Sequence, residues 1–159
     1  MIVVVTGVAG AGKTTIGRML ADELRYRFSD ADEFHSPANV ERMRRGGRLG
    51  DRDREPWLAA MAHAIDGWLR EDADVVLACS ALKARYRARL IRDPLRMALV
   101  YLKVPPDVAR ARVSMRDSHF MPADLVHSQF EALEEPADAI TVDATQPPDV
   151  VVRSIRDAL

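Results

Sequence analysis

The sequence predicts an α/β fold, a three-layer sandwich in which a five-stranded parallel sheet lies between two layers of helices. Five short apolar runs alternate with segments whose apolar residues recur at helical spacing. Directly behind the first run stands Gly7–Thr14, a complete G-x-x-x-x-G-K-[ST] loop, which joins a buried strand to a helix in phosphate-binding proteins. Because ligands of such sheets bind at the carboxyl ends of the strands, we expect the site there.

The first half of the chain supplies three strands and three helices. The apolar run 2–5 predicts a buried strand, and Ile16, Met19, Leu20 and Leu24 mark the helix that follows the loop. Residues 27–30 form a short second strand that ends in acidic residues. Ser36-Pro37 is typical of a helix start, an N-cap followed by proline, and Gly46-Gly47 ends that helix. The spacing of apolar residues over 57–69 predicts a longer helix, and 75–78 the third strand.

The second half continues the alternation. Leu82, Tyr86 and Leu90 share one helical face, and residues 98–102 form a fourth apolar strand. Further helices are expected from Pro105-Pro106-Asp107, across 125–133 and after Pro147-Pro148, with a fifth short strand at 139–142. The sequence has no repeat and no linker, so its 159 residues are expected to form one domain, 1–159.

Composition excludes several classes of function. A net charge of −1 with interspersed charges gives no field for holding nucleic acid. No apolar stretch reaches membrane-spanning length, and Met1 leads straight into the first strand, so we expect a cytoplasmic protein without a membrane partner. The single cysteine, Cys79, ends an apolar run and is expected to pack rather than react. The four histidines have no metal-ligand spacing, and no G-x-S-x-G motif occurs.

The glycine-rich loop predicts a nucleotide site. Its backbone N–H groups are expected to surround a phosphate chain at a helix N-terminus, with Lys13 reaching the β- and γ-phosphates and the Thr14 hydroxyl a magnesium ion. The nucleotide-binding residues are then Gly7, Ala9, Gly10, Ala11, Gly12, Lys13, Thr14 and Thr15.

Acidic residues follow the second strand and are expected beside this loop. On an extended backbone, Asp30 and Asp32 would point the same way. Asp30 would serve the magnesium ion, and Asp32 would accept a proton from a substrate hydroxyl. His35 is placed to touch substrate, although a surface histidine is almost as good an explanation.

Two further segments carry polar groups to the same edge of the sheet. Cys79–Lys83 places the Ser80 hydroxyl and the Lys83 ammonium at a strand end, and Arg87 follows on the next helix. Arg112 and Arg116 lie four residues apart, beside the polar stretch 117–122, where they predict a lid at about 112–127 that delivers guanidinium groups to phosphate. The third strand does not end in aspartate, and there is no Asn-Lys-x-Asp segment, which disfavours a switch-type GTPase.

Taken together, these residues resemble the small P-loop gluconokinases, relatives of shikimate and nucleoside monophosphate kinases. The resemblance rests on motifs from the loop almost to the C-terminus: Gly7–Thr14, Asp30-Ala31-Asp32 with His35, 49–51, Asp53-Arg54, Pro56-Trp57, Cys79–Lys83, Tyr86-Arg87, Arg116, His119–Pro122, Ser128–Phe130 and Leu133-Glu134-x-Pro136. The departures are small. Ala9 and Ala11 replace loop serines, and Ser118 stands where glycine is usual.

The resemblance implies a P-loop fold of the nucleoside monophosphate kinase type and Mg²⁺-dependent phosphorylation of D-gluconate by ATP at its terminal hydroxyl, usually by a homodimer. It implies Lys13, Asp32 and Arg116 as catalytic residues, and adenine contacts from Arg112 near Pro147. Residues implied to bind substrate are Asp32, His35, Arg54, Ser80, Lys83, Arg87, His119 and Gln129. Arg54, Lys83 and Arg87 are the alternatives for the substrate carboxylate, and an ion pair of Arg54 with Asp51 or Glu55 is the competing explanation.

The residues by themselves indicate a magnesium-dependent kinase for a small hydroxylated, anionic acceptor. A kinase for another polyol acid or for a nucleoside monophosphate is the alternative within enzymes. A nucleotide-binding regulatory module is the alternative outside them, although a pure binder needs neither a base nor a lid that neutralises charge.

Overall fold

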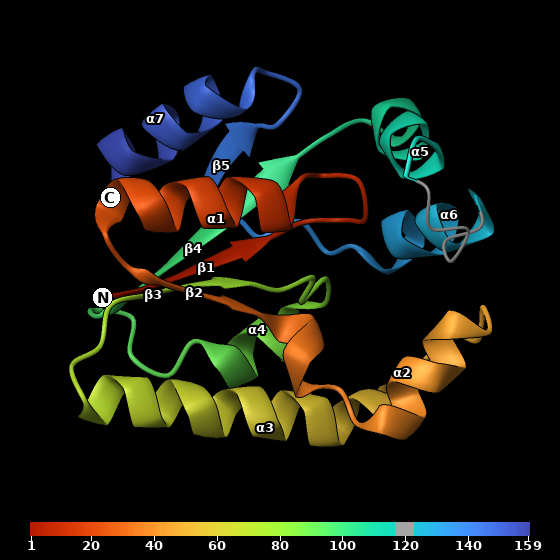
Figure 1. Ribbon diagram of the computed structural model, residues 1–159, viewed down its shortest axis with the longest axis horizontal. Helices are drawn as coiled ribbons and strands as arrows, with labels where there is room; N and C mark the ends of the chain where they lie inside the picture. The colour runs from red at the N-terminus through yellow and green to blue at the C-terminus, as the bar shows by residue number, and fades with distance from the viewer. Residues whose placement is uncertain (117–122) are drawn as a thin grey trace.

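The computed structural model describes residues 1–116 and 123–159, and its centre is a five-stranded parallel sheet (Figure 1). The strand order is β2-β3-β1-β4-β5. The strands are β1 (Ile2–Thr6), β2 (Arg27–Asp30), β3 (Val75–Ala78), β4 (Met97–Lys103) and β5 (Ile140–Asp143). The helices are α1 (Lys13–Leu24), the 3₁₀ turn η1 (Ala31–Phe34), α2 (Pro37–Arg44), α3 (Asp51–Arg70), α4 (Ala84–Leu90), α5 (Pro106–Ser114), α6 (Ala123–Ala132) and α7 (Pro148–Ala158).

Helices cover both faces of the sheet, as the sequence predicted. α1 and α7 lie on one face, and α3 and α4 on the other (Figure 1). The strand β1 is buried on both sides because Val3 and Val5 pack beneath α1 and α7, while Ile2 and Val4 pack against α3 and α4. A strand with two buried faces needs an unbroken apolar run, which explains the composition of residues 2–5.

The predicted elements are all present, with small shifts at their ends. Ser36 caps α2 by accepting the Asn39 N–H at 3.2 Å, as expected from Ser36-Pro37. One local prediction is wrong. The backbone is not extended through Asp32, because β2 ends at Asp30 and the chain then enters η1. Asp30 drives this turn, since its Oδ1 accepts the Asp32 N–H at 3.0 Å.

The topology gathers the loops that follow β1, β2 and β3 at one edge of the sheet. In register, Val5 of β1 pairs with Ala78 of β3 and Val100 of β4, so these strands end side by side. In Figure 1 the helices α2 and α6 lie beyond this edge, on opposite sides of it. Within the described residues, no helix is long and apolar enough to cross a membrane.

Candidate active site

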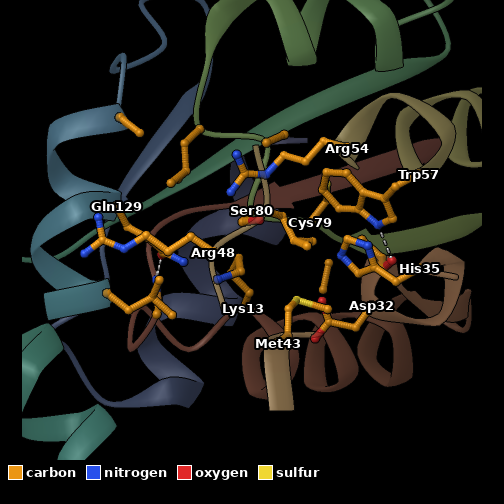
Figure 2. A pocket seen from close by; sticks show the side chains of 18 of the residues that line it. Lys13, Asp32, His35, Met43, Arg48, Arg54, Trp57, Cys79, Ser80 and Gln129 are labelled. Carbon is orange, nitrogen blue, oxygen red and sulfur yellow. Dashed lines mark hydrogen bonds between the residues drawn. The ribbon is translucent and has the colours of Figure 1, made fainter. Parts of the chain in front are cut away.

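A cavity of about 620 Å³ opens at this edge of the sheet. Its walls come from the phosphate loop, the β2–η1 junction, α2 and the loop after it, the start of α3, the β3–α4 segment, and α6. Figure 2 shows Lys13, Asp32, Arg54 and Ser80 around one space, although they are far apart in the sequence. Cationic side chains line more of it than acidic ones do: Lys13, Arg44, Arg48, Arg54, Lys83 and Arg116 against Asp30 and Asp32. Such a cavity suits an anionic ligand.

The phosphate loop has the backbone that its glycines predicted. Gly10 and Gly12 have φ of 83° and 92°, a region that favours glycine. A Cβ at Gly10 would lie 2.5 Å from the carbonyl oxygen of Ala109, so the loop also packs tightly on α5. Inside the loop, the Lys13 Nζ donates to the Val8 carbonyl at 3.1 Å. Burial lowers the pKa of Lys13, and the charges of Asp32 and Asp30 partly oppose this effect.

Thr14 and Asp30 meet beside the loop. The Thr14 hydroxyl donates to Asp30 Oδ2 at 3.0 Å, so two oxygen ligands of the type that Mg²⁺ prefers lie side by side. Within residues 1–116 and 123–159 there is no cluster of three His, Cys, Asp or Glu side chains that could hold a metal ion.

Asp32 faces the cavity from η1. Burial, followed by the negative charge of Asp30, raises its pKa, while His35 and Lys13 lower it. A carboxylate with a raised pKa holds a transferred proton more readily, which suits a general base.

His35 and Trp57 form a stacked pair beside Asp32. Their ring centroids are 4.7 Å apart with an interplanar angle of 4°, and the Trp57 Nε1 donates to the Ala31 carbonyl at 2.7 Å (Figure 2). Burial lowers the pKa of His35, which favours the neutral ring. Its buried Nδ1 has no hydrogen-bond partner among the described residues. The pair therefore holds η1 in place, with His35 in the wall of the cavity.

The three candidates for the substrate carboxylate have different environments. Lys83 lines the cavity but donates to Asp51 at 3.2 Å. The prediction that Arg87 faces substrate does not fit its position, because this guanidinium is 8% exposed and donates to the carbonyls of Ala81, Leu82 and Glu134.

Arg54 lines the cavity from α3, half-buried. The acidic side chains suggested as its partners are engaged elsewhere: Asp51 with Lys83 and Arg85, and Glu55 with Arg89. Among the described residues, no carboxylate lies within ion-pair distance of Arg54. The guanidinium group is therefore available to a ligand.

The remaining predicted residues divide between the cavity and its surroundings. Ser80, Arg116 and Gln129 line the cavity. Arg112 donates to the carbonyls of Gly10 at 3.3 Å and Ala144 at 2.8 Å. Ala144 directly follows β5, and Pro147 lies three residues further along the chain, at the start of α7. His119 lies outside the described residues.

Sequence reasoning missed two features of the cavity. Arg44 and Arg48, from the end of α2 and the loop after it, line its wall. The basic run 42–48 was the available signal, but a helix end rich in arginine usually indicates a solvated surface. Gln129 also accepts a hydrogen bond from the Ala9 N–H at 2.6 Å, a contact that no local pattern announces.

Comparison with known proteins places the chain in a family. The family model described as shikimate kinase matches residues 9–159. A gluconokinase of Gluconobacter oxydans is 43% identical, covering 96% of this chain and 87% of the relative. The thermoresistant gluconokinase of Escherichia coli is 37% identical, covering 96% and 90%. This chain belongs to the gluconokinases, within the wider shikimate kinase family.

Solved structures agree with that assignment. A gluconokinase from Sinorhizobium meliloti superposes with a TM-score of 0.85 at 38% identity, covering 96% of this chain and 87% of that one. Shikimate kinase from Aquifex aeolicus, at 19% identity, has a TM-score of 0.61 and covers 99% and 95%, which supports the fold alone. The gluconokinase resemblance and the predicted P-loop kinase fold are therefore confirmed.

Proposed function

We propose that this protein transfers the γ-phosphoryl group of ATP to the terminal hydroxyl of D-gluconate, giving 6-phospho-D-gluconate. Membership of the gluconokinases supports the reaction. The observation that carries the proposal is that one cavity joins the phosphate loop and Asp32 to Arg54, a guanidinium without a carboxylate partner in the described part of the chain.

The phosphate loop and Lys13 would bind the triphosphate. Thr14 and Asp30 fit a magnesium ion, which when bound supplies charge neutralisation between the phosphates. Arg112, close to the 143–147 turn, would lie at the adenine end, and Arg116 would contact the transferring group. Arg116 belongs to the proposed lid at about 112–127, of which residues 117–122 lie outside the described part.

Asp32 would accept the proton of the attacking hydroxyl. Lys13, whose charge acts on Asp32, would bring the phosphoryl group to the same place. His35, which lines the cavity, would orient a second hydroxyl, and Ser80 would donate from the β3–α4 segment.

Arg54 would bind the carboxylate at the other end of gluconate. A partly desolvated carboxylate requires a cationic partner, and the planar guanidinium group can offer two parallel hydrogen bonds. Lys83 and Arg87 are less suited, because their charged groups already have partners in this structure.

A panel of acceptors in an ADP-release assay tests the function: D-gluconate, sorbitol, other polyol acids and nucleoside monophosphates. We expect Arg54→Ala to cost about 2–5 kcal/mol in kcat/KM for gluconate, as for truncation of one partner of a buried charge pair. Sorbitol has no carboxylate, so its smaller rate should change much less. Arg52→Ala, at an exposed position of the same helix, is the matched control.

Equal losses on gluconate and sorbitol would reject the role of Arg54, and failure of the wild-type protein to phosphorylate gluconate would reject the function. The resemblance also leads us to propose a cytoplasmic homodimer with one catalytic domain per chain. Light scattering after gel filtration would test the oligomeric state.

A further inference from the structure

Gln129 connects α6 to the phosphate loop across 120 residues of sequence. Its Oε1 accepts the hydrogen bond of the Ala9 N–H at 2.6 Å, and the side chain lines the cavity (Figure 2). The resemblance implied that this residue binds substrate, without naming the group that it contacts.

The contact fixes which end of the amide is which. A backbone N–H can only donate, so the carboxamide oxygen must face Ala9. The other polar atom of the same planar group is Nε2, which carries two N–H donors. Beyond its contact with the loop, Gln129 therefore offers two N–H donors on Nε2 and one remaining lone pair on Oε1.

Lys13 and Gln129 are held on one peptide group. The Val8 carbonyl accepts from the Lys13 Nζ at 3.1 Å, and the N–H of the same Val8–Ala9 peptide donates to Gln129. Hydrogen bonds at both ends of a peptide polarise and strengthen each other. This geometry places the Gln129 amide at the part of the loop where the Lys13 ammonium is fixed, which is the end that receives the terminal phosphates.

We propose that Gln129 binds the γ-phosphoryl group of ATP, with Oε1 anchored to the Ala9 N–H and Nε2 donating to a γ-phosphoryl oxygen. This inference rests on the proposed function only in taking ATP as the nucleotide. A donor at that position would also give α6, which follows the proposed lid, a direct contact with ATP that ADP cannot make.

The test compares two nucleotides that differ in the γ-phosphate. Affinities for ADP and for the β,γ-imido analogue of ATP are measured by calorimetry with Mg²⁺ and without acceptor, for wild type, Gln129→Glu and Gln129→Met. The glutamate retains an acceptor for the Ala9 N–H but replaces the donors with negative charge. We expect it to weaken the imido analogue about tenfold or more, as for loss of a hydrogen bond to a charged group, and ADP about twofold at most.

Gln129→Met should weaken the imido analogue to a smaller extent, because it removes the donor without adding charge. Glu131→Gln makes the reverse exchange at an exposed position of the same helix, beyond the proposed lid, and should leave both affinities unchanged. A thermal melt of each variant shows whether the protein is folded. If Gln129→Glu does not fold, the comparison of the two nucleotides is made with Gln129→Met.

Two outcomes would overturn the proposal. Equal weakening of ADP and the imido analogue would show that Gln129 only shapes the loop, and tighter binding of both would show that it blocks the phosphate site. Because no gluconate is present in the assay, neither outcome depends on the acceptor. Failure of the proposed function would appear separately, as absence of gluconate turnover by the wild type.

Discussion

Replacement of Arg87 tests whether this arginine stabilises the fold or binds substrate. Its guanidinium is almost completely buried and donates to the carbonyls of Ala81 at 3.1 Å, Leu82 at 2.8 Å and Glu134 at 2.7 Å. Arg87 therefore connects the β3–α4 segment, which contains Ser80, with the segment after α6. Arg87→Met retains most of the side-chain volume and removes all three hydrogen bonds.

The expected loss in the free energy of unfolding can be worked out for each carbonyl in turn. The Leu82 oxygen keeps a second donor, the Glu134 N–H at 3.0 Å, so two carbonyls lose their donor. Each hydrogen bond to a charged group contributes about 1.5–3 kcal/mol, which gives about 3–6 kcal/mol for two. Burial disfavours the charged guanidinium, as the lowered pKa of Arg87 indicates, and its removal offsets part of this sum. We expect a net loss of about 2–4 kcal/mol in the free energy of unfolding.

Urea denaturation of the wild type and Arg87→Met measures this loss, with Arg89→Met as control. Arg89 lies on the same helix but pairs with Glu55 at the surface, so its loss should be much smaller. In the folded fraction, KM for gluconate should change less for Arg87→Met than for Arg54→Ala. The reasoning would be refuted if Arg87→Met were as stable as the Arg89→Met control and bound gluconate poorly. That result would indicate that Arg87 binds the substrate carboxylate.

Four other predictions concern residues of the cavity and the phosphate loop. Asp32→Asn should lower kcat by about 10²–10⁴-fold, as for loss of a general base, while ATP still binds, and single-turnover assays with a separate nucleotide titration would show this. The same change should raise the melting temperature at neutral pH. Burial and the charge of Asp30 raise the pKa of Asp32 in the folded state, so the wild type loses stability as pH rises through that raised pKa. Asp32→Asn has no group to titrate and does not lose this stability. Lys13→Ala should weaken ATP binding and turnover together. Arg112→Ala should mainly raise KM for ATP and Arg116→Ala mainly lower kcat, and the reverse pattern would exchange their roles.

Much of the fold could be predicted because its signals are local. Each buried strand is a continuous apolar run, and the loop at 7–14 contains its own glycines, lysine and threonine. Parallel strands joined by helices end at the same edge of the sheet, and in the structure β1 and β3 end side by side. The positions of Asp30 and Ser80 at the cavity needed only this information.

The functions of the individual arginines could not be predicted in the same way. Arg54 and Arg87 both stand near the start of a helix that packs on the sheet, and their local sequences do not distinguish them. What distinguishes them is the segment at Glu134, 47 residues after Arg87, whose carbonyl completes a buried site for one guanidinium. The turn at Asp32 was missed for a related reason, since the Asp32 N–H donates to the Asp30 carboxylate, and this hydrogen bond outweighs the extended pattern.

Asp51 pairs with Lys83, another cation of the cavity, which would otherwise compete with Arg54 for the acceptor carboxylate in the proposed function. As the first residue of α3, it accepts from Lys83, Arg85 and Tyr86, and these hydrogen bonds, led by that of Tyr86, hold its pKa well below the usual range. It therefore stays ionised and keeps two cations of the α4 side occupied. Arg54, one turn further along α3, has no such partner in the described part of the chain. Asp51 is thus engaged with the α4 side, and Arg54 stays available for the carboxylate that we propose it binds, at the far end of the acceptor from the phosphate loop.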